Sequence, residues 1–243
     1  MALDLNKLKE TAKEYNTVNM TEEGSSSVEL PPEGVCMLRF VGYVEVGKQA
    51  TTFQGQTKEQ NKAYLFFELS GKKYPPVVDS EGKVHPWVVR HQITVSNSPK
   101  SKGKQLFNSM NYDGYAKAGF AELLGRAYVG DLRHNSNKEG TKKFLTLTDV
   151  NGNYTIRAPF YTDQDGETQQ YNVSEPLSDF KAFLWNAPDK DQWDSIYQEG
   201  EYTVKNSDGT EVKKSLNFYQ EAIKSAINFK GSEAEAMLMG FGE

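Results

Sequence analysis

The stretch that decides the fold is Phe120–Val150, FAELLGRAYVGDLRHNSNKEGTKKFLTLTDV. It predicts the end of a helix, a tight turn at Gly125, and two strands, because side chains alternate along Ala127–His134 and Lys143–Val150. The segment between the strands, Asn135–Lys142, is polar and carries lysines. A helix followed by a hairpin with a basic tip is typical of the second half of a small β-barrel whose loops hold a polyanion.

Three earlier stretches alternate in the same way, Gly34–Val46, Ala63–Ser70 and Trp87–Ser96, and Ser98–Leu124 then has apolar residues at helical spacing. Gly42, within the first of these strands, predicts a bulge. The order of three strands, a helix and two strands is that of the OB-fold, a five-stranded Greek-key barrel. We therefore expect a mainly β protein with helices, of the α+β class, built around an OB-fold barrel.

Composition divides the chain into four parts. Residues 1–33 contain a short predicted helix, Asp4–Tyr15, and a polar linker. Residues 34–157 hold the predicted OB-fold core, which we expect to bind nucleic acid. Asn-Gly and Asp-Gly turn signals with short apolar runs predict an α+β extension at 158–230 that packs on the core. Residues 231–243 are small and acidic, which predicts a mobile acidic tail.

The overall composition is that of a globular protein. The 243 residues are 37% hydrophobic and 12% aromatic, enough for a full core. No apolar run approaches the ~20 residues that cross a bilayer, and the N-terminus lacks the apolar core of a signal peptide, so we expect a cytosolic protein without membrane contacts. The single cysteine, Cys36, lies in an apolar alternating run, which favours a core position.

Charge is distributed unevenly along a chain of net charge −5. Residues 34–157 hold 18 Lys and Arg against 10 Asp and Glu, while the flanking segments are acidic, with 3 against 7 in residues 1–33 and 7 against 16 in residues 158–243. A basic middle favours a polyanionic partner. The alternative is a surface of mixed charge that is segregated along the chain by chance.

The sequence offers no apparatus for catalysis. It has no phosphate-binding loop, dinucleotide fingerprint, nucleophile elbow or CxxC pair. We therefore expect no enzymatic activity, no cofactor and no metal, with a metal-dependent nuclease built on the last set below as a minor alternative. The possible metal ligands form three sets: His85, His91 and His134, which are scattered; Asp163, Asp165 and Glu167, which suit an acidic hairpin tip; and Asp189, Asp191 and Asp194, which suit a helix start.

Binding of single-stranded nucleic acid without sequence preference requires cations along a groove and flat side chains on which bases stack. The outward positions of the first three strands and the two loops that frame the OB-fold ligand face supply both. For Tyr64 and Phe66, burial under the C-terminal segment or in a homo-oligomer interface is the alternative. The candidate DNA-binding residues are Arg39, Tyr43, Lys48, Phe53, Lys58, Lys62, Tyr64, Phe66, Trp87, Arg90, Arg133, Lys138, Lys142 and Lys143.

Four motifs in this order resemble the single-stranded DNA-binding proteins of tailed bacteriophages. They are GVCMLRFVGYVEVG at Gly34–Gly47, YLFFEL at Tyr64–Leu69, ITVSNSPKS at Ile93–Ser101 and LLGRAYVGDLRH at Leu123–His134. The resemblance covers about Gly34–Val150. The segment FLWNAPDKDQWDSIY at Phe183–Tyr197 is also similar to an extension in some of these proteins.

This resemblance implies a protein that coats and protects single-stranded DNA during phage replication and recombination, in the cytoplasm of the bacterial host. It also implies that an acidic tail with a terminal aromatic recruits replication or recombination proteins. Glu233, Glu235, Phe241 and Glu243 partly match such a tail, although Met237–Met239 interrupt it. A tail that folds back onto the basic groove is a second possibility. The rival function is that of a phage structural or adaptor protein that uses an OB-like barrel for protein contacts.

Overall fold

The computed structural model describes residues 30–53, 55–137, 140, 142–205 and 210–240, without the side chains of residues 53 and 205. Residues 31–243 form one compact unit and residues 1–30 a separate one. The predicted helix Asp4–Tyr15 lies outside the described residues. The fold that follows is that of the larger unit.

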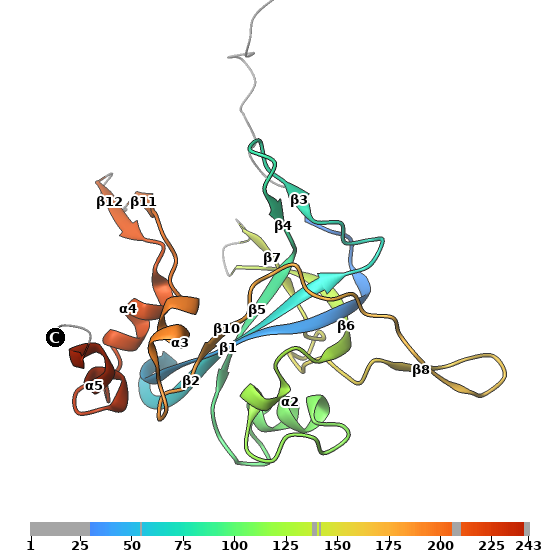
Figure 1. The fold of residues 1–243 in the computed structure, drawn as a ribbon, viewed down its shortest axis with the longest axis horizontal. Helices are drawn as coiled ribbons and strands as arrows, with labels where there is room; N and C mark the ends of the chain where they lie inside the picture. Colours follow the sequence, from blue (N-terminus) through green and yellow to red (C-terminus); the bar gives the residue numbers. More distant parts are fainter. Residues whose placement is uncertain (1–29, 54, 138–139, 141, 206–209, 241–243) are drawn as a thin grey trace, which may run out of the picture. The chain divides into compact units, whose positions relative to one another are not determined.

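The main sheet has the strand order β5-β2-β1-β6-β7, with every neighbouring pair antiparallel (Figure 1). The five predicted strands are therefore present, and they are joined by a short sixth strand, β10, which pairs with β1 in parallel. Their bounds are β1 Gly34–Phe53, β2 Gln56–Ser70, β5 Val88–Thr94, β6 Ala127–Ser136, β7 Lys143–Thr146 and β10 Lys181–Phe183. The protein is mainly β with short helices, as the sequence predicts.

The first two strands are longer than predicted. The polar composition of Gly47–Lys62 predicts a loop, but this stretch continues β1 and β2 as a paired hairpin that turns near Gly55. The predicted bulge is present, because the register of β1 against β2 shifts between Phe40 and Gly42. A Cβ atom at Gly42 would lie 2.6 Å from the Phe66 ring, so the close packing of that ring requires glycine.

The described strands do not form a closed barrel. The sheet has two free edges, β5 and β7, and no backbone ladder joins them within the described residues. One side chain does connect the edges: Nε2 of His91 on β5 accepts a hydrogen bond from the backbone N–H of Leu147, just after β7, at 3.2 Å. The Tyr154 ring meets the His91 ring edge-on at 5.2 Å. The two edges therefore approach each other at His91.

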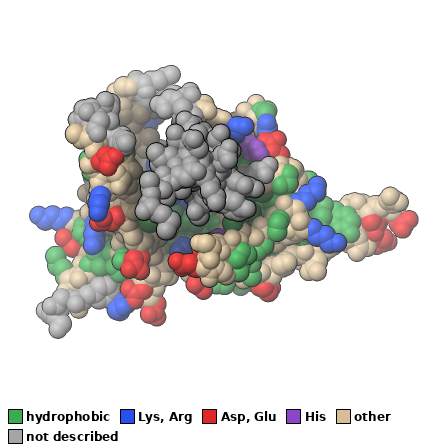
Figure 2. Space-filling model, turned by 90° about the horizontal axis from the view of Figure 1, so that it is seen from above, with side chains coloured by type: hydrophobic (Ala, Val, Ile, Leu, Met, Phe, Trp, Pro, Cys, Tyr) green, Lys and Arg blue, Asp and Glu red, His purple; other side chains and the backbone are tan. Residues whose placement is uncertain are grey.

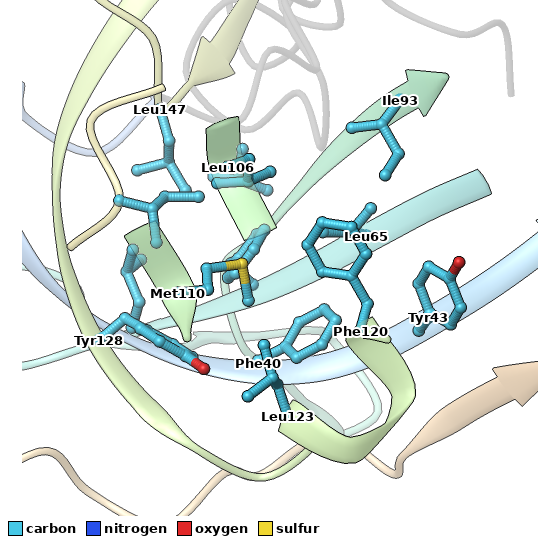
Figure 3. Packing of buried hydrophobic residues seen from close by; sticks show 14 of the residues in the cluster. Phe40, Tyr43, Leu65, Ile93, Leu106, Met110, Phe120, Leu123, Tyr128 and Leu147 are labelled. Carbon is cyan, nitrogen blue, oxygen red and sulfur yellow. The ribbon is translucent and has the colours of Figure 1, made fainter. Parts of the chain in front are cut away.

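The sheet is buried on both faces. The inner face packs against helix α2 (Lys102–Met110) and the 3₁₀ helix η1 (Phe120–Leu123), as Figure 3 shows. The outer face packs against β10 and the helices α3 (Lys190–Ser195) and α4 (Phe218–Lys224) of the C-terminal extension, and against helix α5 (Glu233–Gly240) in the region of the predicted tail. We call these two clusters the inner core and the outer core. Strand alternation explains both, since Leu65 and Phe67 of β2 enter the inner core while Tyr64 and Phe66 enter the outer core.

Three two-stranded hairpins complete the fold: β3 (Val77–Val78) with β4 (Val84–His85), β8 (Phe160–Thr162) with β9 (Thr168–Gln170), and β11 (Glu201–Lys205) with β12 (Glu211–Ser215). Residues 177–186, whose apolar spacing predicts a helix, contain β10 instead. The predicted mobile tail at 231–243 is helix α5 as far as Gly240. Among the described residues, no helix combines the length and the apolar composition needed to cross a membrane.

Candidate nucleic-acid interface

Arg39 lies on the outer side of β1 but holds the protein together. Its side chain is only 12% exposed. It donates hydrogen bonds to the carbonyl oxygens of Gly125 at 2.9 Å, Val173 at 2.8 Å and Ser174 at 3.0 Å, and to the Glu175 carboxylate at 3.1 Å. A phosphate would have to replace several of these bonds. The structure therefore places Arg39 as a clamp between β1 and the start of the C-terminal extension.

The predicted stacking residues Tyr43, Tyr64 and Phe66 are buried, at 4–7% exposure. Tyr64 and Phe66 pack edge-on against Tyr219 of α4, at 5.4 and 5.3 Å between ring centroids. This is the burial under the C-terminal segment that the sequence left open as an alternative. Covered in this way, the two rings present no free face to a base.

Tyr43 lies on the opposite face from the one predicted. The bulge between Phe40 and Gly42 changes the phase of strand alternation, so Tyr43 enters the inner core and stacks on Phe120 at 5.6 Å. Its hydroxyl donates to the Glu45 carboxylate at 2.9 Å. Burial, with the nearby Glu45 charge, raises the pKa of Tyr43 above its ordinary value. The residue serves the fold and not a ligand face.

Arg90 on β5 stays exposed and lies among aromatic rings. Its guanidinium carbon lies 5.4 Å from the centroid of Tyr64, 5.6 Å from that of Phe218 and 6.0 Å from that of Tyr219. Nη1 donates to the Tyr219 hydroxyl at 3.1 Å. These contacts hold the cation in a fixed orientation while one side faces solvent. We call these four residues the Arg90 cluster.

Lys62 on β2 lies beside this cluster and is 9% exposed. Its ammonium group donates to the Gln60 amide oxygen at 2.9 Å and to the Thr94 hydroxyl at 2.8 Å, both of them neutral acceptors. None of the ion pairs among the described residues includes Lys62. Burial lowers the pKa of this ammonium group. A cation largely removed from water without a carboxylate partner creates a positive potential that an incoming anion would compensate.

Three adjoining cavities follow β5 from this point. The first, about 520 Å³, lies between β1, β2 and α4 and is lined by Lys62, Gln92 and Phe218. The second, about 400 Å³, shares Gln92 and adds Lys102. The third, about 550 Å³, shares Thr94 with the second and is lined by Lys104 and Phe107 of α2. Neighbouring cavities share lining residues, and Tyr64 and Phe218 of the Arg90 cluster line the first of them. We therefore treat the three cavities and the Arg90 cluster as one surface, which we call the β5 groove.

The sequence contained signals for only part of this groove. Lysines crowd the start of α2, and two of them line it: Lys102, whose ammonium group donates to the Gly152 carbonyl at 2.6 Å, and Lys104, which lies 5.0 Å from the Phe107 ring. Phe218 carried no such signal, because nothing in the sequence places α4 beside β5. Glu45 and Glu221 also line the groove, so its charge is not uniformly positive.

The remaining predicted residues do not converge on one site. Lys58 is exposed on the β1–β2 hairpin, Lys142 is exposed just before β7, and Lys143 is exposed as the first residue of β7. No described contact joins the β1–β2 hairpin to the connection between β6 and β7. Trp87 packs on the inner core, and its indole N–H donates to the Pro75 carbonyl at 3.1 Å. Lys48 and Arg133 are half-buried, whereas Lys138 and the side chain of Phe53 lie outside the described residues.

The predicted tail residues that are described belong to a packed helix. The Glu235 carboxylate accepts a hydrogen bond from the Gly231 N–H at 2.6 Å, and Glu233 lies in the first turn of α5, where negative charge is favourable. On the same helix Ala234 is buried in the outer core, with Met237 and Leu238 packed against it. Phe241 and Glu243 lie outside the described residues.

Several of the possible metal ligands have other partners. His85 pairs with Asp79 at 2.7 Å, and His134 donates to the Pro31 carbonyl at 2.8 Å. Asp189 accepts from the Gln192 N–H at the start of α3, and Asp194 pairs with Lys190. The turn between β8 and β9 holds Asp163, Asp165 and Glu167, and Figure 2 shows acidic side chains at the end of this projection. Within the described ranges, no group of three His, Cys, Asp or Glu side chains could hold a metal ion.

Cys36 is a core residue. Its thiol donates to the Gly130 carbonyl at 3.4 Å, and burial raises the pKa of the thiol to about 12. The protonated thiol is a poor nucleophile and a poor metal ligand.

Comparison of the chain with protein-family models, with curated proteins and with solved structures finds no match.

Proposed function

We propose that the protein is a non-enzymatic single-stranded DNA-binding protein and that the strand lies in the β5 groove. The observation that carries this proposal is the combination, on one edge of the sheet, of Arg90 held among aromatic rings with Lys62 as a buried cation without a carboxylate partner. Lys102 and Lys104 extend the positive charge along the same path.

The groove offers what a single strand requires. Phosphates need cations spaced along a path, and bases need flat groups, since every base has a π-face whatever its sequence. The groove supplies lysines and Arg90 for the first and aromatic rings for the second. Amides and hydroxyls such as Gln92 and Thr94 line it between the cations. We therefore expect binding with little sequence preference.

The strand order supports an OB-fold reading of the core. Numbered along the chain without the short hairpin β3–β4, the five main strands lie in the order 3-2-1-4-5, which is that of an OB-fold opened between its third and fifth strands. The contact of His91 with the residue after β7 lies across that opening. In an OB-fold, strands two and three carry the ligand, and here they are β2 and β5, which carry Lys62 and Arg90.

In this proposal the protein coats and protects single-stranded intermediates of phage DNA replication and recombination in the cytoplasm of the bacterial host. Recruitment of other proteins through residues 233–240 is not part of it, because α5 packs on the outer core. The proposed protein needs no cofactor.

The test is a fluorescence-anisotropy titration of labelled oligo-dT and of a matched duplex with the full chain at several salt concentrations. We expect tight binding of oligo-dT, weaker binding of the duplex, and a linear fall of log affinity with log salt. Failure to bind oligo-dT at low salt, or an affinity that salt does not change, would contradict the proposal.

The second candidate function is that of a phage structural or adaptor protein. It is favoured by the burial of Tyr64 and Phe66 and by apolar side chains exposed on two hairpins, Phe160 and Tyr161 on β8 and Tyr202 on β11. Exposed apolar groups on projecting strands suit protein contacts. A gel shift discriminates the two functions, since an adaptor would leave oligo-dT unretained.

A further inference from the structure

We propose that Phe218, the first residue of α4, is the side chain on which a base of the bound strand stacks, so that the C-terminal extension forms one wall of the DNA site. This inference rests on the proposed function. The C-terminal extension covers Tyr64 and Phe66, which the sequence predicted as stacking residues. The same extension places another aromatic ring, that of Phe218, in the groove.

Phe218 is 43% exposed although its side chain is wholly apolar. It lines the same cavity as Lys62, Tyr64 and Gln92, so its exposed surface faces the groove. An apolar ring held open to a groove with cations is unfavourable in water and becomes favourable when a flat ligand covers it.

The contacts around the ring leave room for stacking. Tyr64 and Tyr219 meet Phe218 nearly at right angles, at 82° and 84°, with centroids 5.6 and 5.3 Å away. Neither ring is therefore stacked in parallel on it. The Arg90 guanidinium carbon lies 5.6 Å from the ring centroid. A base stacked on the ring would therefore lie near Arg90 and in the cavity that Lys62 also lines.

Hydrogen bonds anchor the start of α4, which carries Phe218. Its backbone N–H donates to the Leu216 carbonyl at 2.7 Å, at the end of the β11–β12 hairpin. Two residues later, Gln220 donates to the Trp193 carbonyl at 2.8 Å and accepts from the Asn217 amide at 2.8 Å. A rigid aromatic platform loses little conformational entropy on binding, which favours affinity.

The experiment compares Phe218→Leu and Phe218→Trp with the matched control Phe160→Leu. Leucine keeps apolar volume against Tyr64 and Tyr219 but removes the flat face, whereas tryptophan keeps the face. Phe160 is 42% exposed on β8 and does not line the groove. We expect Phe218→Leu to weaken oligo-dT binding about 5- to 150-fold, the range of one lost base stack. Phe218→Trp and Phe160→Leu should stay within about twofold of the wild type.

Ultraviolet cross-linking of oligo-dT to the wild-type chain gives a second readout that does not depend on the stability of a variant. We expect the cross-linked peptide to contain Phe218. Suppose that the wild-type chain binds oligo-dT with the expected salt dependence. An unchanged affinity for Phe218→Leu together with a cross-link outside α4 would then overturn this inference and leave the proposed function standing. Failure of the wild-type chain to bind oligo-dT would instead overturn both.

Discussion

The two faces of the main sheet are formed by the same strands. The sequence predicted the cover of the inner face better than the cover of the outer face. The inner core is covered by α2 and η1, which lie between β5 and β6 along the chain. The outer core is covered by α3, α4 and α5, which come after all five main strands. Alternation therefore tells which side chains share a face, whereas only the tertiary fold decides whether that face meets solvent or a distant segment.

The largest expected effects come from truncations in the two cores. Phe67→Ala in the inner core and Ile223→Ala in the outer core each remove a fully buried side chain and should lower the free energy of unfolding by roughly 3–5 and 2–5 kcal/mol. Because residues 31–243 form one compact unit, both should shift the same single transition in urea. A separate, earlier transition that Ile223→Ala alone moves would show that the outer cover is an independent lid.

The next effect is a dependence of stability on pH through His91. Removal of the ring from water lowers the pKa of His91 to about 4, whereas the unfolded chain keeps a value near 6.5. The unfolded state therefore takes up the proton first, so stability is complete above pH 6.5 and falls as the pH drops towards 4, by up to about 3 kcal/mol. Denaturation midpoints across this range test it. In His91→Gln the decline between pH 6.5 and 4 should disappear, and its persistence would assign the decline to other groups.

A smaller effect on stability distinguishes the structural role of Arg39 from DNA binding by the groove. Arg39→Gln removes hydrogen bonds to the carbonyls of Gly125, Val173 and Ser174 and should cost about 2–3 kcal/mol of stability. Below the unfolding transition, its affinity for oligo-dT should remain within about twofold of the wild type. A large loss of affinity with an unchanged melting temperature would instead make Arg39 a phosphate ligand.

The smallest effect concerns an acidic residue in the groove. Glu221→Gln removes one negative charge from the cavity that Lys62 and Phe218 line and should tighten oligo-dT binding about two- to threefold at low salt. The control is Glu233→Gln, which changes the same kind of exposed residue in the first turn of α5. Equal tightening by both variants would point to net charge and not to the groove.

Much of the core could be predicted from the sequence because its determinants are local. Period-two alternation identified the five strands, and Gly42 indicated the bulge in β1. Even so, the effect of that bulge was not predicted. The extra residue in β1 places Tyr43 on the inner face of the sheet instead of the outer face. A glycine indicates where a strand bends, but not how the alternation continues after the bend.

The candidate site was less predictable because its determinants are distant in sequence. Arg39 looks like a free outward cation until the carbonyls of Val173 and Ser174 are placed beside it. Arg90 was identified from its strand and Lys62 from a predicted loop, whereas Phe218 belongs to the groove only because α4 packs on β2. Residue type identified the kind of chemistry, and tertiary contacts selected which residues remain available for it.

The most direct test of the central claim, that the β5 groove binds single-stranded DNA, is the affinity of Arg90→Glu for oligo-dT as a function of salt. Lys190→Glu is the control, since it makes the same change in charge on α3, outside both the Arg90 cluster and the three cavities. We expect affinity to fall about tenfold for Arg90→Glu, with a shallower salt dependence because a phosphate contact is lost, and to change little for Lys190→Glu. Equal affinities for Arg90→Glu and the wild type at every salt concentration would contradict it.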